Sequence, residues 1–372
     1  MPTSAVDCVQ PAIRHTRDQL FRPFRFGQWS RLAVVGILAA ELHAGGCNSG
    51  GWHNPLSPHP RKGHEFVATS FLQIDPSRFD PARFAQFAGL IVAIILLAII
   101  LFFIFLYISS VFRFILFDSV LKKRCSISEG WQRWRRAGRR FFLWQIVFLI
   151  AEFFFMGVLI GVPLAVAAAL GWFHDFQQHV ARTVLGVIFL IGLFLVFALV
   201  AVVIQLLAKD FLVPIMALED VDFADGWSRL LTLIRPEPGK YAVYLLLKIV
   251  LAIAAAILFG ILTLIPILVL IVPAVVAVIA GHAAGLGWNI TTVSLAIILG
   301  TLLMIVLIYV IALVNVPATV FFPAFAIYFF AARYPRLDAL LNPPPPAPEL
   351  PPMLESPPPE PPPLPPAPET IG

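Results

Sequence analysis

Long apolar stretches alternate with short polar segments along most of the chain. The plainest apolar run covers residues 88–112, which are 25 residues without a charged side chain. Two further runs, residues 141–170 and 184–208, are interrupted by only one or two polar side chains each. About 20 apolar residues are enough for a helix to cross the hydrocarbon core of a bilayer, so each run predicts a transmembrane helix.

Two longer runs follow, at residues 241–281 and 290–330. Each would be roughly 60 Å long as a single helix, about twice the hydrocarbon thickness. Prolines interrupt both runs, at Pro266 and Pro273 in the first and at Pro317 in the second. Each run is therefore either one crossing helix that continues outside the membrane or as a re-entrant piece, or a tight helical hairpin.

The apolar run at residues 32–42 is too short to cross a bilayer unaided. It either recruits the Gly-rich residues that follow it or re-enters on the same side. Together the runs predict an all-α, polytopic transmembrane helical bundle with about six spans, and eight spans as the alternative.

Composition agrees with lipid as the main solvent of this chain. Apolar residues make up 59% of it, only 13% are charged, and the mean hydropathy is +0.89. Soluble domains have about 45–50% apolar and about 25% charged residues, so this chain could not cover itself with a water-facing surface.

The net charge of +5 does not indicate nucleic-acid binding, because the basic residues flank apolar runs. Nine of the 26 Lys and Arg residues lie between residues 113 and 140. The segments 1–31, 113–140, 209–240 and 333–341 together hold 20 of the 26. The positive-inside rule predicts that these segments and both termini are cytoplasmic. We expect the membrane to be a bacterial cytoplasmic membrane.

The last residues differ from the rest of the chain. In residues 342–372, 16 of 31 residues are proline, a composition that cannot form a packed core. We expect two parts: a transmembrane helical domain at residues 1–341 and a disordered, proline-rich cytoplasmic tail. The tail is either simply solvated or a ligand for a proline-binding protein partner.

An internal repeat with a spacing of 96 residues is the most informative motif. Residues 126–133 align without a gap with residues 222–229, and Gly-Trp stands at the same place in both. We take the repeated units to be residues 88–170 and 184–281. The second copy is more acidic than the first, which predicts that it faces protein or the basic copy itself.

Each copy predicts a short amphipathic helix in the cytoplasmic interface, with tryptophan toward lipid and arginine at anionic head groups. The residues expected there are Trp131, Trp134, Trp227, Arg133, Arg135 and Arg136. Membrane lipids are therefore the expected partners, and the oligomeric state stays open.

Glu152 is the best candidate for a functional group inside the membrane. It lies about eleven residues into its span, and Lys248 lies at a comparable depth in a later one. Ionisable groups in this environment are costly and tend to be paired or functional. Glu152 either pairs with Lys248 or snorkels to the interface, belongs to a polar path with Gln145 and Gln205, or is a protonated acid without a role.

The usual catalytic motifs are missing from the sequence: it has no GxSxG, HExxH, P-loop or GxGxxG. We therefore predict no enzymatic activity, no metal and no cofactor. The favoured hypothesis is a non-enzymatic membrane scaffold or accessory protein. The alternative is a transporter or lipid-handling protein that uses a polar path around Glu152, formed with Gln145, Gln205 and Lys248.

Residues 20–33, residues 211–216 and the dipeptide Gly226-Trp227 resemble an uncharacterised family of prokaryotic polytopic membrane proteins. That family is distantly similar to the membrane domain fused in front of some glycerophosphodiester phosphodiesterases. The resemblance implies a fold and not an activity. The largest soluble stretch before the tail is the loop at residues 43–85, far shorter than the ~250 residues of a phosphodiesterase barrel.

Overall fold

The computed structural model describes residues 4–39, 81–169, 180–285, 287 and 289–342. The described residues form helices and no strand. The elements are η1 (Val6–Cys8), α1 (Val9–Phe21), α2 (Phe26–Leu38), α3 (Pro81–Leu121), α4 (Ile127–Ala169), α5 (Val180–Leu207), the π-helical turn η4 (Ala208–Leu212), α6 (Val213–Glu219), α7 (Phe223–Ile234), α8 (Pro238–Ala283), α9 (Ile290–Ala331) and α10 (Pro335–Leu341).

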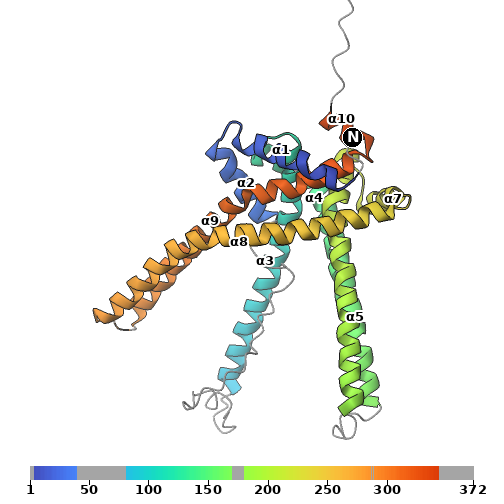
Figure 1. Cartoon of the computed structure of the whole chain (residues 1–372). Coiled ribbons are helices and arrows are strands. Elements are labelled where there is room, and N and C mark those ends of the chain that lie inside the picture. The colour runs from blue at the N-terminus through green and yellow to red at the C-terminus, as the bar shows by residue number, and fades with distance from the viewer. Residues whose placement is uncertain (1–3, 40–80, 170–179, 286, 288, 343–372) are drawn as a thin grey trace, which may run out of the picture.

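The helices converge in one helical body, from which three arms diverge (Figure 1). Apart from Thr263, the buried residues lie in four segments, which make up the body: 5–39, 109–145, 208–248 and 312–337. The arms are the remaining parts of α3, of the α4–α5 pair and of the α8–α9 pair. Their large apolar side chains are exposed, as suits helices that lipid surrounds.

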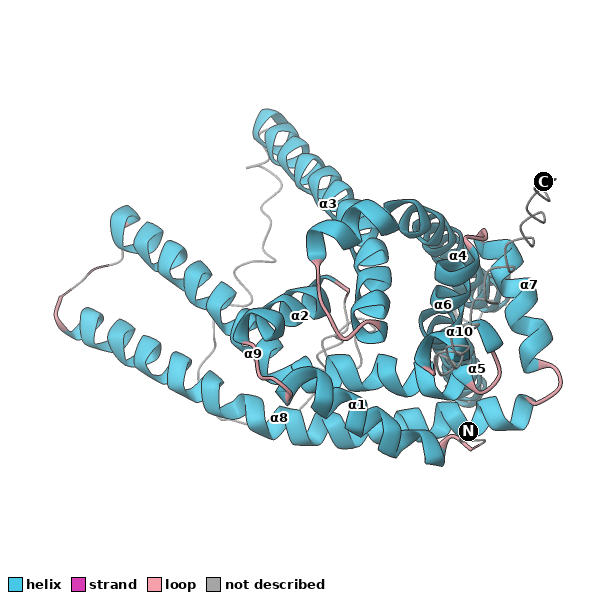
Figure 2. Cartoon of the chain, turned by 90° about the horizontal axis from the view of Figure 1, so that it is seen from above, coloured by secondary structure: helices cyan, strands magenta, loops and turns pink. Residues whose placement is uncertain are grey.

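Five helical segments among the described residues are long and apolar enough to cross a membrane, so the chain is a multi-pass membrane protein. They are Ala88–Leu121, Ile127–Ala169, Thr183–Glu219, Pro238–Ala283 and Ile290–Ala331. The predicted count of six, and the alternative of eight, is not reached within the described residues. The two longest runs are single helices and not hairpins, because α8 and α9 continue through their prolines. The two helices pack against each other in the body, where Tyr244 of α8 stacks on Phe325 and Phe329 of α9, and they lie apart toward the arm tip (Figure 2).

The short apolar run at residues 32–42 begins in α2, which packs into the body with Leu32 and Val35 fully buried. Residues 40–42 lie outside the described part. Helix α2 ends in the body, α3 starts at the tip of an arm (Figure 1), and residues 40–80 between them lie outside the described part. The question of whether this run crosses the membrane therefore falls outside the described residues, as does the proline-rich tail.

A proline in α9 helps to attach α2 to the body. Pro317 has no N–H, so the carbonyl of Leu313, four residues earlier, lacks its helical donor. The indole of Trp29 on α2 donates to this carbonyl at 2.8 Å. Gly36 brings the same helix close to α9, since a Cβ there would lie 2.9 Å from the Thr319 methyl group.

Candidate functional site

A cavity of about 780 Å³ lies between α4 and α5, next to the body. Three of the four residues of the predicted polar path line it: Gln145 and Glu152 on α4, and Gln205 on α5. Arg113 of α3 and Lys209 of η4 complete its polar residues. The fold thus brings these predicted residues together, and it adds two cations that the sequence analysis did not connect with them.

Polarity changes along the length of this cavity. Helices α4 and α5 run in opposite directions, so Gln145, Gln205 and Lys209 lie at its body end. Toward the arm tips its walls are apolar and come from Phe153, Met156, Phe194 and Phe197, among others. Glu152 lies between the two zones. The cavity therefore has a cationic, hydrogen-bonding end and an apolar end.

Gln145 is held in place at the body end. The hydroxyl of Ser110 on α3 donates to its Oε1 at 2.5 Å, and both residues are buried. Its carbonyl is therefore satisfied within the protein. The Nε2 amide remains as the donor group of this side chain.

Lys248 does not pair with Glu152. Its Nζ contacts both carboxylate oxygens of Asp210, at 2.6 and 2.5 Å, and the hydroxyl of Tyr244 donates to Asp210 at 2.9 Å. All three side chains are buried. The Glu152–Lys248 ion pair, one of the alternatives for Glu152, is thus not formed, because the π-helical turn η4 places Asp210 against α8.

This buried pair adjoins the cavity and does not line it. A small hollow of about 40 Å³ borders Asp210 and Lys248, and Arg113 and Lys209 line both this hollow and the larger cavity. The sequence analysis missed Asp210 as an intramembrane partner. One signal was available: Lys209 and Asp210 directly follow the apolar run 184–208.

The predicted interfacial residues of the first repeat are divided between the surface and the core. Arg133, Arg135 and Arg136 are exposed, as expected for head-group contact. Trp134 is buried and stacks on Phe114, with ring centroids 5.9 Å apart, so it does not face lipid. The segment is also not a separate short helix, because it forms the first turns of the 43-residue helix α4.

The second repeat segment does form a separate helix, α7, and it packs against the first. Arg140 on α4 pairs with Asp220 at 2.8 Å and with Asp222 at 2.9 Å. Trp227 on α7 lies 6.1 Å from Trp144 on α4, measured between ring centroids. The acidic copy therefore faces the basic copy, which is one of the two arrangements that the sequence predicted for it.

The glycines of the two Gly-Trp pairs have a similar role. Gly130 lies against Ile115, and Gly226 lies against Leu212; a Cβ would come within 3.1 and 2.7 Å of these side chains. In both places glycine lets a helix pack closely on the end of the preceding apolar helix. The duplication itself stays a prediction.

The comparison with known proteins gives a family and no activity. A family model described as "Family of unknown function (DUF7544)" matches residues 3–340. No curated protein and no solved structure matches the chain. The distant similarity to the membrane domain of glycerophosphodiester phosphodiesterases stays a prediction. Since the match covers most of its length, the chain belongs to this family of unknown function.

Proposed function

We propose that this member of the family is a non-enzymatic, lipid-handling membrane protein that binds an anionic phospholipid in the α4–α5 cavity. The observation that carries the proposal is the change of polarity along that cavity. Arg113 and Lys209 would bind the phosphate, Gln145 and Gln205 would offer hydrogen bonds to the head group, and the apolar walls would hold the acyl chains.

The dimensions of the cavity suit a lipid. Along α5 and η4, Lys209 at the cationic end follows Phe194 at the apolar end by fifteen residues. At 1.5 Å per residue this is roughly 22 Å, somewhat more than one leaflet of a hydrocarbon core about 30 Å thick. A head group at Lys209 and acyl chains along Phe197 and Phe194 fit this length.

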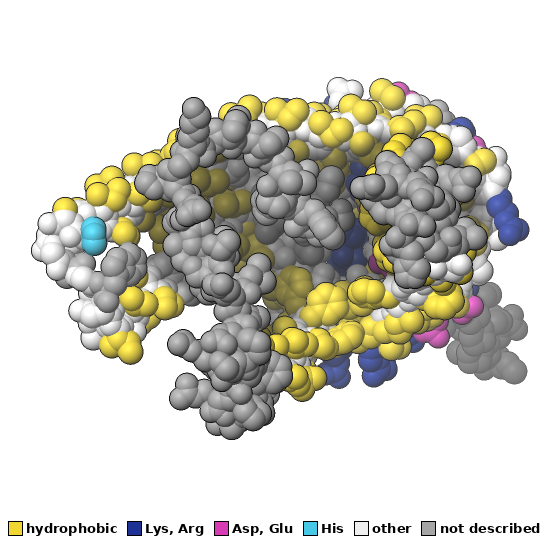
Figure 3. Space-filling model, turned by 90° about the horizontal axis from the view of Figure 1, so that it is seen from below, with side chains coloured by type: hydrophobic (Ala, Val, Ile, Leu, Met, Phe, Trp, Pro, Cys, Tyr) yellow, Lys and Arg dark blue, Asp and Glu magenta, His cyan; other side chains and the backbone are white. Residues whose placement is uncertain are grey.

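The view from the arm tips supports access from the bilayer. Figure 3 shows Lys and Arg side chains at the bottom of the hollow between the arms, with apolar surface around them. A cation in that position attracts the phosphate of a lipid while the arms contact its chains. By the positive-inside rule, the head group would belong to the cytoplasmic leaflet.

The scaffold hypothesis has less support in the contacts of the body. Trp134 and Trp227, which were expected to anchor interfacial helices, pack against other aromatic rings. The acidic surface of Asp220 and Asp222 is occupied by Arg140. Lipid handling needs neither of these surfaces, and therefore we place it first.

The test is mass spectrometry of the lipids that stay bound to the full chain in mild detergent. We expect a phospholipid to copurify and to be retained at least tenfold less by the double variant Arg113→Gln/Lys209→Gln. The matched control is Arg14→Gln/Arg139→Gln, which removes two exposed guanidinium groups, on α1 and on α4, that lie outside the cavity. Equal retention of lipid by both variants would contradict the proposal.

Glu152 distinguishes lipid binding from lipid movement. It lies between the polar and apolar zones of the cavity, where a head group would pass if the lipid moved along α4. If the protein moves lipid, Glu152→Gln should slow transfer of a fluorescent phospholipid in proteoliposomes without reducing the amount of lipid that copurifies. Unchanged transfer would restrict the function to binding.

The tail stays a separate prediction as a docking element for a protein partner. Its residues lie outside the described part, so the test compares partners recovered with the full chain and with a truncation after Leu341. A partner recovered only with the full chain would support docking, and identical recovery would contradict it.

A further inference from the structure

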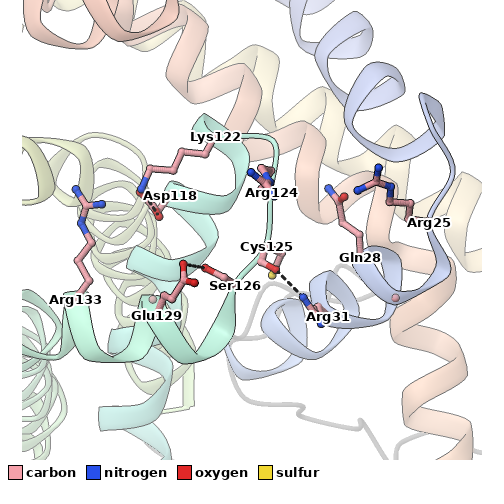
Figure 4. Close-up of a pocket in the computed structure, with 12 residues that line it drawn as sticks. Arg25, Gln28, Arg31, Asp118, Lys122, Arg124, Cys125, Ser126, Glu129 and Arg133 are labelled. Atoms are coloured by element: carbon pink, nitrogen blue, oxygen red, sulfur yellow. Dashed lines mark hydrogen bonds and ion pairs between the residues drawn. The ribbon is translucent and has the colours of Figure 1, made fainter.

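A second cavity, of about 650 Å³, lies in the body on the surface predicted to be cytoplasmic. Its walls come from the start of α2, the end of α3 and the turn that leads into α4 (Figure 4). The lining residues are Arg25, Gly27, Gln28, Arg31, Asp118, Lys122, Arg124, Cys125, Ser126, Glu129, Gly130 and Arg133. From them we propose that this cavity binds a small soluble anion with two or more phosphate groups.

The charge of the lining favours a polyvalent anion. It includes five Lys or Arg side chains and two carboxylates, a net formal charge of +3. Lys122 is engaged by Asp118, at 2.9 Å in the same helix. No carboxylate in the described part of the chain lies within 4 Å of Arg25, Arg31 or Arg124. A cluster of guanidinium groups repels itself unless an anion lies between them.

The cavity is held open by contacts across its edge. Gln28 on α2 donates to the carbonyl of Lys123 at 3.0 Å, and Arg31 donates to the carbonyl of Cys125 at 3.4 Å. These bonds tie α2 to the turn between α3 and α4. Figure 4 shows Arg25 and Gln28 on α2 facing Arg124 on that turn. The backbone segments that carry the cationic groups are therefore held in place before any ligand arrives, which lowers the entropy cost of binding.

Further features of the lining point to phosphate groups. Helices α2 and α4 both begin at this cavity, and their first N–H groups add a favourable field for an anion. Burial raises the pKa of the Cys125 thiol, so it stays protonated and adds no negative charge. Guanidinium groups match phosphate geometry with paired hydrogen bonds.

The ligand should be soluble and not a lipid. Among the described residues that line this cavity, none has an aromatic or large aliphatic side chain. Acyl chains would find no wall there, and a nucleobase would find no ring for stacking. The phosphate groups themselves are thus the recognised feature, and inorganic pyrophosphate is the simplest probe.

A second hollow beside the first extends the cationic surface. It has a volume of about 370 Å³ and shares Arg25, Gln28 and Arg124 with the larger cavity. Its own lining adds Arg22 and Lys123, together with Asp18, which lies 3.9 Å from Arg22. A chain of phosphates could therefore extend past Arg124, so tripolyphosphate should bind more tightly than pyrophosphate.

The test is isothermal titration calorimetry with pyrophosphate on the full chain in nanodiscs of neutral phosphatidylcholine. We expect saturable binding that weakens as salt rises and a Kd at least tenfold higher for Arg25→Gln/Arg124→Gln. Both side chains are exposed, so the variant should keep its fold. The control Arg135→Gln/Arg139→Gln should keep the Kd of the natural chain. Absence of binding, or the same Kd in both double variants, would overturn the proposal.

A second arm separates a soluble ligand from a lipid head group. Nanodiscs that contain phosphatidylglycerol should leave the Kd for pyrophosphate within a factor of about three once bulk salt is matched. Competition by the anionic lipid that disappears in Arg25→Gln/Arg124→Gln would assign the cavity to head groups and overturn the proposal. Arg113→Gln/Lys209→Gln should bind pyrophosphate normally, so failure of the lipid proposal leaves this one unaffected.

Discussion

The helical body and the three arms are made from the same long helices, but these helices pack in different ways in the two regions. In the body, α3 and α4 approach so closely that a Cβ on Gly138 would lie 2.9 Å from the backbone Cα of Val111. In the arm of α4, nothing lies within 4 Å of the Cβ position at Gly157 or Gly161. The body is thus stabilised by contacts within the chain, while the arms depend on lipid.

The two main cavities also differ between the two regions, in the polarity of their walls. The cavity of the body has charged and polar walls, and the cavity of the α4–α5 arm combines a cationic end with apolar walls. On our proposals, the ligand of the first cavity comes from water and the ligand of the second comes from the bilayer. The difference teaches that the side chains surrounding a cation decide which anion it can recognise.

The largest expected effect is in the body, at the buried pair. Lys248→Met leaves the carboxylate of Asp210 buried without its cation and should lower the free energy of unfolding by about 3–5 kcal/mol. Chemical denaturation in detergent would measure it. The double variant Asp210→Leu/Lys248→Met should recover most of the loss. If it unfolds as easily as the single variant, the pair is not what stabilises this contact.

A smaller effect compares glycines of the two regions directly. Gly138→Val pushes α3 and α4 apart and should cost about 1–3 kcal/mol of stability. Gly157→Val, in the arm of the same helix, should change stability by less than about 0.5 kcal/mol. Unfolding curves for the two variants give the comparison. Equal losses would show that the arm packs as tightly as the body.

Hydrogen bonds should follow the same division. Trp29→Phe leaves the carbonyl of Leu313 without a donor in the body and should cost about 1 kcal/mol. Ser294→Ala removes a hydrogen bond to Ile290 in the exposed arm of α9 and should cost almost nothing. A thermal unfolding series monitored by circular dichroism can rank these two variants against the natural chain. A larger loss at Ser294 would contradict the division.

The smallest effect is a pH dependence of the body. His15 lies buried between the carbonyl of Val120 and the hydroxyl of Tyr328, and burial lowers its pKa below the ordinary value of 6.5. The unfolded chain therefore binds the proton more readily, and stability should fall as pH drops below about 6.5. Unfolding at pH 7.5 and pH 5.5 would measure this loss. It should shrink in His15→Gln, and an unchanged pH dependence would exclude His15 as its source.

Much of the architecture could be predicted because hydropathy is a local property. Each of the four segments predicted to be cytoplasmic from their Lys and Arg residues contributes to the body, which also includes residues 312–330 of the last apolar run. One cavity does contain three of the predicted path residues: Gln145 and Glu152 on α4, and Gln205 on α5. Polar side chains in apolar runs are easy to find, and helices adjacent in sequence often pack together.

Pairings between distant helices could not be predicted in the same way. Lys248 was matched with Glu152 by depth alone, but the π-helical turn η4 places Asp210 beside it. Trp134 follows an amphipathic pattern, but α3 covers it through Phe114. Depth in a span and helical period describe one helix at a time, and neither specifies which helix lies opposite.

The sequence by itself determined that the chain is a membrane protein, which of its segments are apolar and which polar residues interrupt them. Each of these properties depends only on residues that are near one another in the chain. Tertiary structure decided that Arg113 and Lys209 lie at the polar end of a lipid-sized cavity, and that α2 and the α3–α4 turn form a second one. These sites join residues far apart in the chain. Their geometry depends on how closely the helices approach and how each is rotated, which side-chain packing across the body determines.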